Sequence, residues 1–266
     1  MISCVLQGGL GNQMFQVAAT YNLAIKNNDS AVFNFDESYT PLQGEKVYKY
    51  KNNIFKNFTH KKDFVTKENF NEKKFSFDLI EYKDGLLLNG FFQSEKFFEE
   101  NKKDITEKLL NGLKIEKEKW YRVLNWVESN IINEQKLVSV HVRRGDYLNF
   151  PNVHTPCSLD YYKKALLLME EKIGKFTPVF ISDDKNWCLE TFKDINCLIS
   201  PFNDEIEDFI LMINCHSNII ANSSFSWWGA YLNQNQNKVV IGPKKWFGLD
   251  GPKDQHDTIP NNWIKI

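Results

Sequence analysis

The stretch KLVSVHVRRGD, residues 136–146, joins a hydrophobic segment to two adjacent arginines and a Gly-Asp turn. The small and apolar residues of Leu137 to Val142 predict a β-strand that ends at the turn. Two neighbouring guanidinium groups repel each other unless an anion, a carboxylate or water separates them. Arg143 and Arg144 therefore form either an anion site or an ordinary surface ion pair with one solvated neighbour, and their place in the fold must decide.

The chain downstream of this stretch alternates between strand and helix patterns. Alternation of this kind predicts a parallel sheet flanked by helices, and hence the α/β class. The predicted strands are residues 136–142, 177–183, 195–200, 218–222 and 238–242. The predicted helices are residues 158–174, 185–194, 204–216 and 226–234.

The N-terminal half opens as β-α-β, with strands at 2–6 and 31–35 around a GGLGN turn and a helix at 13–27. A further strand is predicted at 85–93. A helix is predicted at 94–112, with Ser94 as its N-cap and Gly112 just past its end. Residues 37–85 show no clear period and receive no assignment. A boundary near residues 130–136 divides the chain into domains 1–135 and 136–266.

Composition excludes several classes of protein. The 33 Lys and Arg against 34 Asp and Glu give a net charge of −1, which argues against a general nucleic-acid binder. The start of the chain does not resemble a signal peptide, and no run of 18 apolar residues occurs. The five cysteines never form CxxC and are expected to be reduced thiols, mostly in the core. We therefore expect a cytoplasmic protein.

Polar clusters follow three of the predicted parallel strands, where ligands bind in such sheets. They are HVRRGD (141–146), ISDD (181–184) and NSSFS (222–226). Arg143 and Arg144 point to opposite sides of an extended strand, so one can face a ligand while the other braces the site. A guanidinium binds phosphate oxygens bidentately, and the structural alternative is a salt bridge to Asp146 or Asp183.

The other polar residues also have two interpretations each. Ser223 and Ser224 precede a helix whose N-terminus suits a phosphate, although simple N-capping by Ser224 or Ser226 explains one serine. Asp183 and Asp184 either receive ribose or base donors, hold a metal or cap the next helix. No metal-binding motif occurs, so a metal is the weakest option. Trp227 and Trp228 are expected in the core.

The glycine turn at residues 8–13 matches neither nucleotide-binding glycine motif, but it lets the backbone approach a ligand closely. Together with the arginine cluster it favours an enzyme with a cleft between two domains. The alternative is a non-catalytic α/β module that binds an anionic sugar or a nucleotide.

GGLGNQMFQ, GFFQSEKFF, HVRRGDY, ISDD and NIIANSSFSWWGAYLN, in that order, together resemble the bacterial α-1,2-fucosyltransferases. The resemblance implies a GT-B-like enzyme with two Rossmann-like domains facing a cleft and GDP-fucose bound mainly by the C-terminal half. It implies transfer of L-fucose, with inversion, to the 2-hydroxyl of a terminal β-galactoside, without a bound metal. Another GDP-sugar-dependent fucosyltransferase is the nearest alternative within enzymes.

The same resemblance suggests roles for individual residues. The catalytic candidates are His141, Arg144 and Asp146. The predicted donor and sugar contacts are Arg143, Arg144, Asp184, Asn222, Ser223, Ser224, Phe225, Asn12 and Gln13. Asp146 is the first candidate for the general base, although an ion pair with Arg143 explains it nearly as well. The acceptor glycan is either lipid-linked or free, and any membrane contact is expected to be peripheral.

Overall fold

The computed structural model describes residues 1–132 and 134–266. The chain forms two compact units. The first comprises Met1–Glu116 and Asp254–Pro260, and the second comprises Lys117–Lys253 and Asn261–Ile266. The division thus lies before the predicted boundary at residues 130–136, and a C-terminal segment returns to the first unit.

The second unit is built around a six-stranded parallel sheet with the order β6-β5-β4-β7-β8-β9. Its strands are β4 (Lys136–Val142), β5 (Phe176–Ser182), β6 (Leu198–Ile199), β7 (Ser217–Ile219), β8 (Val240–Gly242) and β9 (Ile264–Lys265). Its α-helices are α3 (Lys117–Asn130), α4 (Leu159–Ile173), α5 (Lys185–Thr191), α6 (Glu205–Asn214) and α7 (Ser224–Leu232). The strand order reverses between β4 and β7, which is where doubly wound sheets bind nucleotides.

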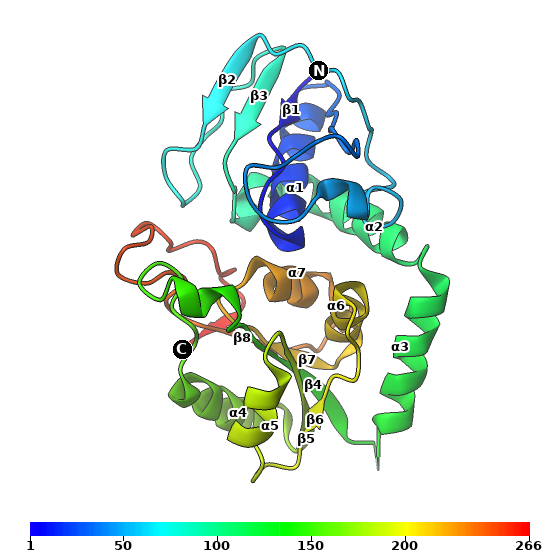
Figure 1. Cartoon of the computed structure of the whole chain (residues 1–266), viewed down its shortest axis with the longest axis vertical. Coiled ribbons are helices and arrows are strands. Elements are labelled where there is room, and N and C mark those ends of the chain that lie inside the picture. The colour runs from blue at the N-terminus through cyan, green and yellow to red at the C-terminus, as the bar shows by residue number, and fades with distance from the viewer. Residues whose placement is uncertain (133) are drawn as a thin grey trace. The chain divides into compact units, whose positions relative to one another are not determined.

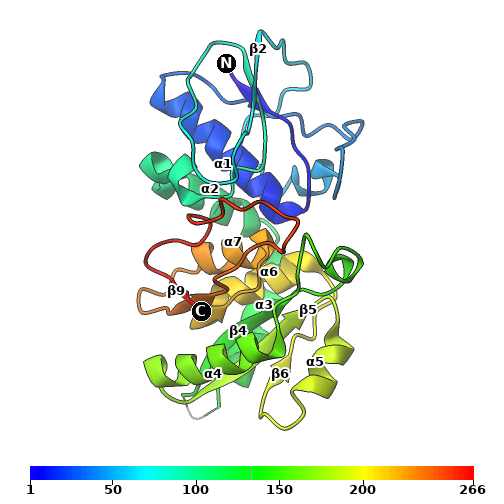
Figure 2. The same cartoon turned by 90° about the vertical axis from the view of Figure 1, so that its left-hand side faces the viewer.

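Helices cover both faces of this sheet, with α4 and α5 on one side and α6 and α7 on the other (Figures 1 and 2). Apolar side chains of β4 and β5 pack against α4, and Phe180 stacks on Phe192 with ring centroids 4.1 Å apart. Trp227 and Trp228 are fully buried, as predicted. The α/β class predicted from the alternating pattern is therefore confirmed.

Helix α3 was not predicted. It belongs to the second unit, which is why that unit begins at Lys117, before the predicted boundary at residues 130–136. Only Val123 and Val127 of this helix are buried, so its apolar stripe is narrow. It packs against α6 through two ion pairs, Lys119 to Asp204 at 2.7 Å and Arg122 to Glu207 at 2.8 Å. These contacts place α3 in the second unit.

The first unit carries a three-stranded parallel sheet with the order β1-β3-β2. Its elements are β1 (Ser3–Cys4), α1 (Leu10–Lys26), the 3-10 helix η1 (Val47–Tyr50), β2 (Glu68–Asn71), β3 (Leu86–Asn89), the 3-10 helices η2 (Glu95–Phe97) and η3 (Glu99–Asn101), and α2 (Lys102–Leu113). The predicted strand at 31–35 forms only isolated parallel bridges, through Ala31 and Phe33.

Aromatic packing fills the region that the sequence left unassigned. Phe33 and Phe35 stack with centroids 5.6 Å apart, and Phe35 stacks on Phe55 at 5.2 Å. Phe55 is fully buried. Clustered rather than periodic aromatics hold this segment, which is why no regular element was apparent.

The predicted helix at 94–112 is divided into η2, η3 and α2. Ser94 does cap, because its side chain accepts the amide of Lys96, but it caps η2 rather than a long helix. Gly112 lies inside α2 instead of after it. A Cβ at Gly112 would stand 2.4 Å from the carbonyl oxygen of Asn53, so close packing rather than helix termination requires this glycine.

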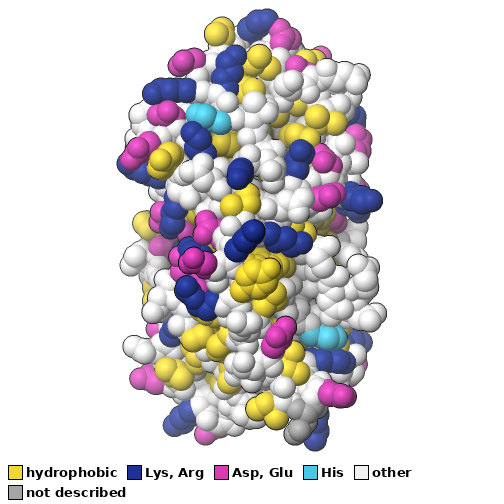
Figure 3. Space-filling view, turned by 90° about the vertical axis from the view of Figure 1, so that its right-hand side faces the viewer, with side chains coloured by type: hydrophobic (Ala, Val, Ile, Leu, Met, Phe, Trp, Pro, Cys, Tyr) yellow, Lys and Arg dark blue, Asp and Glu magenta, His cyan; other side chains and the backbone are white. Residues whose placement is uncertain are grey.

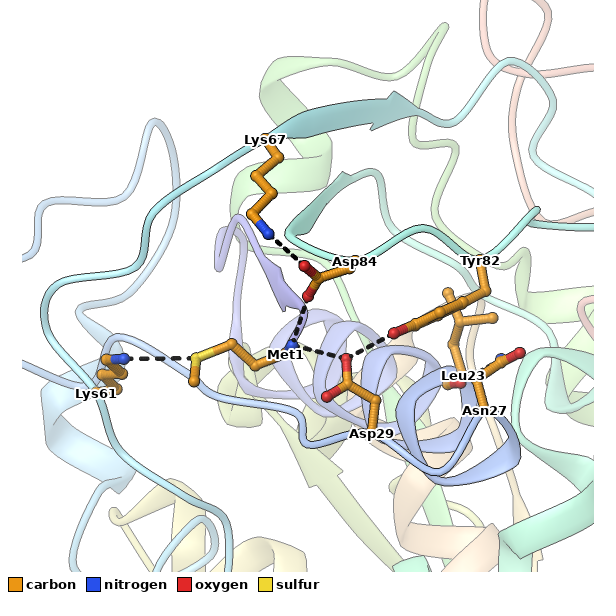
Figure 4. Close-up of polar contacts among 8 residues, drawn as sticks. All are labelled: Met1, Leu23, Asn27, Asp29, Lys61, Lys67, Tyr82 and Asp84. Atoms are coloured by element: carbon orange, nitrogen blue, oxygen red, sulfur yellow. Dashed lines mark hydrogen bonds and ion pairs between the residues drawn. The ribbon is translucent and has the colours of Figure 1, made fainter.

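Ionic contacts tie the beginning of β1 to its neighbours (Figure 4). The Met1 ammonium pairs with Asp29 at 2.8 Å and with Asp84 at 3.0 Å. Lys67 also pairs with Asp84, and the Tyr82 hydroxyl donates to Asp29. The turn after α1 and the segment before β3 are thereby held at the edge of the sheet.

The segment Asp254–Pro260 docks on the first unit through its carboxylates. Asp257 accepts the amide of Phe77 at 3.0 Å and pairs with Lys96 at 3.4 Å. The Ser94 hydroxyl donates to the carbonyl oxygen of Asp257. Because the Asp257 side chain is 6% exposed, these contacts are shielded from water.

On the face seen in Figure 3, basic and acidic side chains are interspersed, in keeping with the balanced composition. Within the described residues, no helix is both long and apolar enough to cross a membrane.

Candidate active site

The two arginines after β4 are held by different carboxylates. Arg143 pairs through Nη2 with Asp146 at 2.7 Å and through Nη1 with Asp183 at 3.1 Å. Arg144 pairs through Nε with Asp184 at 3.0 Å. Both predicted partners of an ion pair are thus present, and two guanidinium groups and three carboxylates meet at the ends of β4 and β5.

Arg143 also contacts the ring of Tyr147. Its guanidinium is 5.6 Å from the centroid of the Tyr147 ring. The Tyr147 hydroxyl in turn donates to the carbonyl oxygen of Asn222 at 2.9 Å, one residue before the N-cap of α7. Burial raises the pKa of Tyr147 well above its usual value, so the phenol stays protonated and keeps donating. Arg143 and the start of α7 therefore flank the point where the strand order reverses.

Arg144 lies toward α5. Its guanidinium is 4.2 Å from the centroid of Trp187, and its partner Asp184 caps α5 by accepting the amide of Trp187 at 3.1 Å. The hydrogen bond from Arg144 is the leading cause that keeps the pKa of Asp184 below its usual range. Asp184 thus fulfils the capping role that the sequence offered as one of its alternatives.

Gly145 allows Asp183 to approach both arginines. A Cβ at Gly145 would lie 2.5 Å from Oδ2 of Asp183. Asp183 Oδ1 also accepts the backbone amide of Arg144 at 3.0 Å. Any larger residue at this turn would displace the carboxylate that fixes the arginine pair.

His141 is buried in β4, and its ring lies 5.8 Å from that of Phe225. Burial, with a smaller contribution from Arg143, lowers the pKa of His141 to about 3. Its Nδ1 has no hydrogen-bond partner among the described residues. The imidazole is therefore neutral at working pH, and it cannot supply positive charge to an anion.

Helix α7 begins without a side-chain cap from its N-cap residue. Ser223 is the N-cap residue, but its side chain makes no capping bond, and the hydroxyl of Ser226 donates back to the Ser223 carbonyl oxygen. Neither Ser224 nor Ser226 is the N-cap. Ser224 and Phe225 form the first turn and are half-buried. The amides of such a turn carry partial positive charge.

The side chain of Asn222, which was predicted to contact the donor, forms hydrogen bonds with neighbouring loops. Its amide nitrogen donates to the carbonyl oxygens of Thr155 and Trp246, and its Oδ1 accepts from Cys157. The residue is 3% exposed. Because both amide hydrogens are already used, Asn222 holds loops around the site, and its direct contact with the donor stays a prediction.

Asn12 and Gln13, the two residues of the first unit that were predicted to contact the sugar, differ in burial. Gln13 is fully buried and donates to the carbonyl oxygens of Gly8 and Glu45, so it braces the glycine turn and does not face a sugar. Asn12 is half-buried, and its Oδ1 accepts the side-chain amide of Gln93 at 2.8 Å. Only Asn12 stays a candidate for sugar contact.

Tyr147 and Trp187 are site residues that the sequence reading did not select. Each follows one of the polar clusters by a few positions, and each places a ring against an arginine. For Tyr147, the signal that could have indicated it is an aromatic residue within four positions of an arginine at a strand end. Trp187 follows a different strand from Arg144, so no local pattern joins the two.

The whole chain, residues 1–266, matches the family model described as glycosyl transferase family 11. The chain belongs to this family. It is 32% identical to the Escherichia coli O-antigen biosynthesis glycosyltransferase WbnK, over the full length of both proteins. It is 30% identical to an Escherichia coli alpha-1,2-colitosyltransferase, over 98% of this chain and 97% of the relative. The chain is thus a glycosyltransferase resembling the α-1,2-fucosyltransferases.

Solved structures of fucosyltransferases share the fold of this family 11 protein. POFUT1 in complex with GDP matches with a TM-score of 0.55 at 13% identity, covering 91% of this chain and 97% of that one. NodZ from Bradyrhizobium matches with a TM-score of 0.53 at 12% identity, covering 87% and 93%. These similarities confirm the predicted GT-B-like α/β fold.

Proposed function

We propose that the protein transfers L-fucose from GDP-fucose to the 2-hydroxyl of a terminal β-galactoside, with inversion at the anomeric carbon. Family membership and relatives named as α-1,2-fucosyltransferases support this choice of reaction. The donor, the acceptor and the residue roles below are proposals for this chain.

One observation carries the proposal. Arg143 and the N-terminus of α7 flank the reversal of strand order between β4 and β7, joined through Tyr147 and the carbonyl oxygen of Asn222. A guanidinium beside helix N–H groups, at the carboxyl edge of a parallel sheet, suits the diphosphate of a nucleotide sugar. We therefore give Arg143 the leading role at the diphosphate, in place of Arg144, which the sequence favoured.

The chemistry requires charge stabilisation on the departing nucleotide. As the bond from fucose to GDP breaks, positive charge grows on the sugar and negative charge on the β-phosphate. Donors that contact the phosphate more strongly in the transition state than in the ground state lower the barrier. We propose that the diphosphate displaces the exposed carboxylate of Asp146 from Arg143, while Asp183 keeps the guanidinium in place.

The remaining site residues then receive supporting roles. Arg144 holds Asp184, whose free carboxylate oxygen lone pairs can accept donors from guanosine. The neutral His141 offers a hydrogen-bonding nitrogen rather than charge. Asp146, once released from Arg143, is the first candidate to accept the proton of the acceptor hydroxyl.

The donor sugar has one specific competitor. The relative named alpha-1,2-colitosyltransferase is 30% identical over nearly the whole chain, so a colitose nucleotide is the second candidate donor. Colitose lacks the 3-hydroxyl of L-fucose. A site that hydrogen-bonds this hydroxyl would therefore favour GDP-fucose strongly.

We further propose that the enzyme works in the cytoplasm on a lipid-linked or free glycan. The five cysteines are all free, as expected in a reducing compartment. The balanced charge is consistent with a glycan rather than a nucleic acid as the second substrate.

The proposal is tested by incubating purified protein with GDP-fucose or GDP-colitose and a panel of β-galactosides, with and without EDTA. GDP release that depends on a galactoside and is faster with GDP-fucose supports the assignment. Faster release with GDP-colitose moves the donor to the second candidate. Saturable GDP binding without release, whatever the acceptor, would leave a non-catalytic nucleotide-binding module. Release that EDTA abolishes would overturn the expected independence from metal.

A further inference from the structure

The loop between β4 and α4 carries a half-buried histidine, His154. It follows the 3-10 helix η4 (Asp146–Asn149), which contains Tyr147. The imidazole stacks on the Tyr147 ring, with centroids 4.9 Å apart and 23° between the ring planes, and it contacts the ring of Phe247 at 5.6 Å. These three rings form the ring row. Since Arg143 lies 5.6 Å from the centroid of Tyr147, the ring row ends at this guanidinium.

Backbone contacts fix the loop of His154 against the loop of Phe247. The amide of Gly248 donates to the carbonyl oxygen of Val153 at 2.9 Å. A Cβ at Gly248 would lie 2.3 Å from the carbonyl oxygen of Asn152, so the two backbones are in direct contact. The contact between the two rings therefore stands on a backbone that is itself held in place.

Asn222 joins the same two loops to the start of α7. Its side-chain amide donates to the carbonyl oxygens of Thr155 and Trp246, each one position away from a residue of the ring row. Its own carbonyl oxygen accepts the hydroxyl of Tyr147 at 2.9 Å. Tyr147 is thus held twice, by its hydroxyl on Asn222 and by its ring on His154.

His154 offers the shape of its ring to this arrangement rather than a charge. Burial lowers the pKa of His154 below its usual value; it outweighs the smaller effect of Asp146, which raises this pKa, and Arg143 lowers it slightly. The imidazole is therefore uncharged at neutral pH and adds no positive charge beside the guanidinium. Aromatic pairs prefer defined geometries, so the stack fixes the plane of the Tyr147 ring. Another flat ring could supply the same contact.

We propose that His154 is a positioning residue for the leaving-group site of the transfer reaction. The assignment rests on the proposed function for the identity of the leaving group, GDP. By stacking on Tyr147, His154 keeps the tyrosine hydroxyl on the carbonyl oxygen of Asn222 and the tyrosine ring beside the guanidinium of Arg143. The guanidinium and the first turn of α7 then keep their spacing while negative charge grows on the departing diphosphate.

The test separates the ring of His154 from its nitrogens and from folding. His154→Ala removes the ring, His154→Phe keeps a flat ring without nitrogen, and His154→Gln keeps a polar nitrogen without a ring. His216→Ala is the matched control, because His216 is also half-buried in the second unit but lies just before β7, at the opposite edge of the sheet. The turnover number kcat, both KM values, GDP affinity by calorimetry and the melting temperature are measured for each protein.

We expect His154→Ala and His154→Gln to lower kcat, and to weaken GDP binding, by about 10- to 100-fold, while the acceptor KM stays within about twofold. GDP affinity reports the same contact because free GDP carries the charge that develops as the bond to fucose breaks. His154→Phe should restore kcat and GDP affinity to within about threefold of wild type. His216→Ala should keep the kcat of the wild type even where its melting temperature falls.

A double-mutant cycle tests whether His154 acts through Tyr147. Tyr147→Ala removes the ring on which the imidazole stacks, so His154→Ala in that background should lower kcat by less than about twofold more. Losses that simply multiply in the double variant would show that His154 acts by another route, and would overturn the inference.

Other results would overturn it as well. Unchanged kcat and GDP affinity in His154→Ala would leave His154 without a role at the site. Recovery in His154→Gln but not in His154→Phe would show that a nitrogen contacts the substrate and that the ring does not matter. A wild type that binds GDP but transfers no fucose would count against the proposed reaction alone, because the GDP affinities of the variants still decide the role of His154. A wild type that binds no GDP would overturn both.

Discussion

Replacing Arg143 by alanine should remove most of the catalytic activity and little of the stability. Arg143→Ala removes its ion pairs with Asp146, whose side chain is 60% exposed, and with Asp183, whose side chain is 26% exposed, so losing both pairs costs about 1–2 kcal/mol of folding free energy. The diphosphate contact is different, because it strengthens as GDP departs. Loss of one such donor typically lowers kcat by about 100- to 1000-fold, or about 3–4 kcal/mol of activation free energy.

Arg144 provides the matched comparison. Its guanidinium stacks on Trp187 and holds the cap of α5, so Arg144→Ala should chiefly lower thermal stability. We expect its kcat to stay within about tenfold of wild type. Arg143→Lys keeps the positive charge but cannot bind two oxygens at once as a guanidinium does, so its kcat should lie between those of wild type and Arg143→Ala.

The assay is GDP release at saturating galactoside, with the melting temperature of each variant as control. Donor and acceptor KM values are measured for the same preparations. If kcat falls 100-fold or more in Arg144→Ala and less than tenfold in Arg143→Ala, the placement of the diphosphate beside α7 is refuted. An effect of Arg143→Ala confined to the acceptor KM would refute its role at the leaving group.

Four further results are expected. In Asp146→Asn, transfer should be lost while slow hydrolysis of GDP-fucose persists, and unchanged transfer would exclude Asp146 as the base. The pKa of His141, about 3 when folded and near 6.5 when unfolded, means that the unfolded chain binds more protons between these values. The free energy of unfolding of the wild type should therefore fall by up to about 5 kcal/mol relative to His141→Asn as pH falls through this window. Equal pH profiles of the two proteins in urea unfolding would contradict this. Burial raises the pKa of Glu72 to about 7, with a smaller contribution from the charge of Asp254, and it outweighs the backbone N–H bonds that lower this pKa. Below pH 7 the folded chain therefore binds more protons at this site than the unfolded chain does. The wild type should accordingly lose stability relative to Glu72→Gln as pH rises from about 4.5 to 7. A wild type that gains stability over this range would show that folding lowers the pKa of Glu72 instead. Finally, Asp257→Ala should cost about 1–2 kcal/mol of folding free energy, more than Asp254→Ala, because it leaves the Phe77 amide and the Lys96 ammonium without their partner; thermal unfolding of the two variants compares these costs.

The sequence was most informative where structure is local and periodic. The strand at Lys136–Val142 was predicted to the residue, because its apolar run ends at a charged turn. The parallel sheet followed from the alternation of strands and helices, and the meeting of the polar clusters followed from the shared carboxyl edge of its strands. The strand order, which decides that Arg143 and α7 are neighbours, depends on long-range pairing that no local pattern records.

Other parts could not be predicted for identifiable reasons. Helix α3 carries Trp120, Val123, Leu124 and Val127 at helical spacing, so the helix itself could have been predicted. Its place in the second unit could not, because that place depends on ion pairs with α6, distant in the sequence. Gln13 and Asn222 are polar residues beside predicted ligand sites, yet burial gives both of them structural hydrogen bonds. Residue type alone does not distinguish an amide that binds a ligand from one that holds a loop.

The measurement that tests the central claim most directly is the structure of the product formed from GDP-fucose and a β-galactoside. Two-dimensional NMR of the purified product reports both the carbon that carries the new bond and the anomeric configuration of the fucose. We predict an α-linked fucose on O2 of the terminal galactose. A bond to any other hydroxyl, or a β-linked fucose, would contradict inverting transfer to the 2-position.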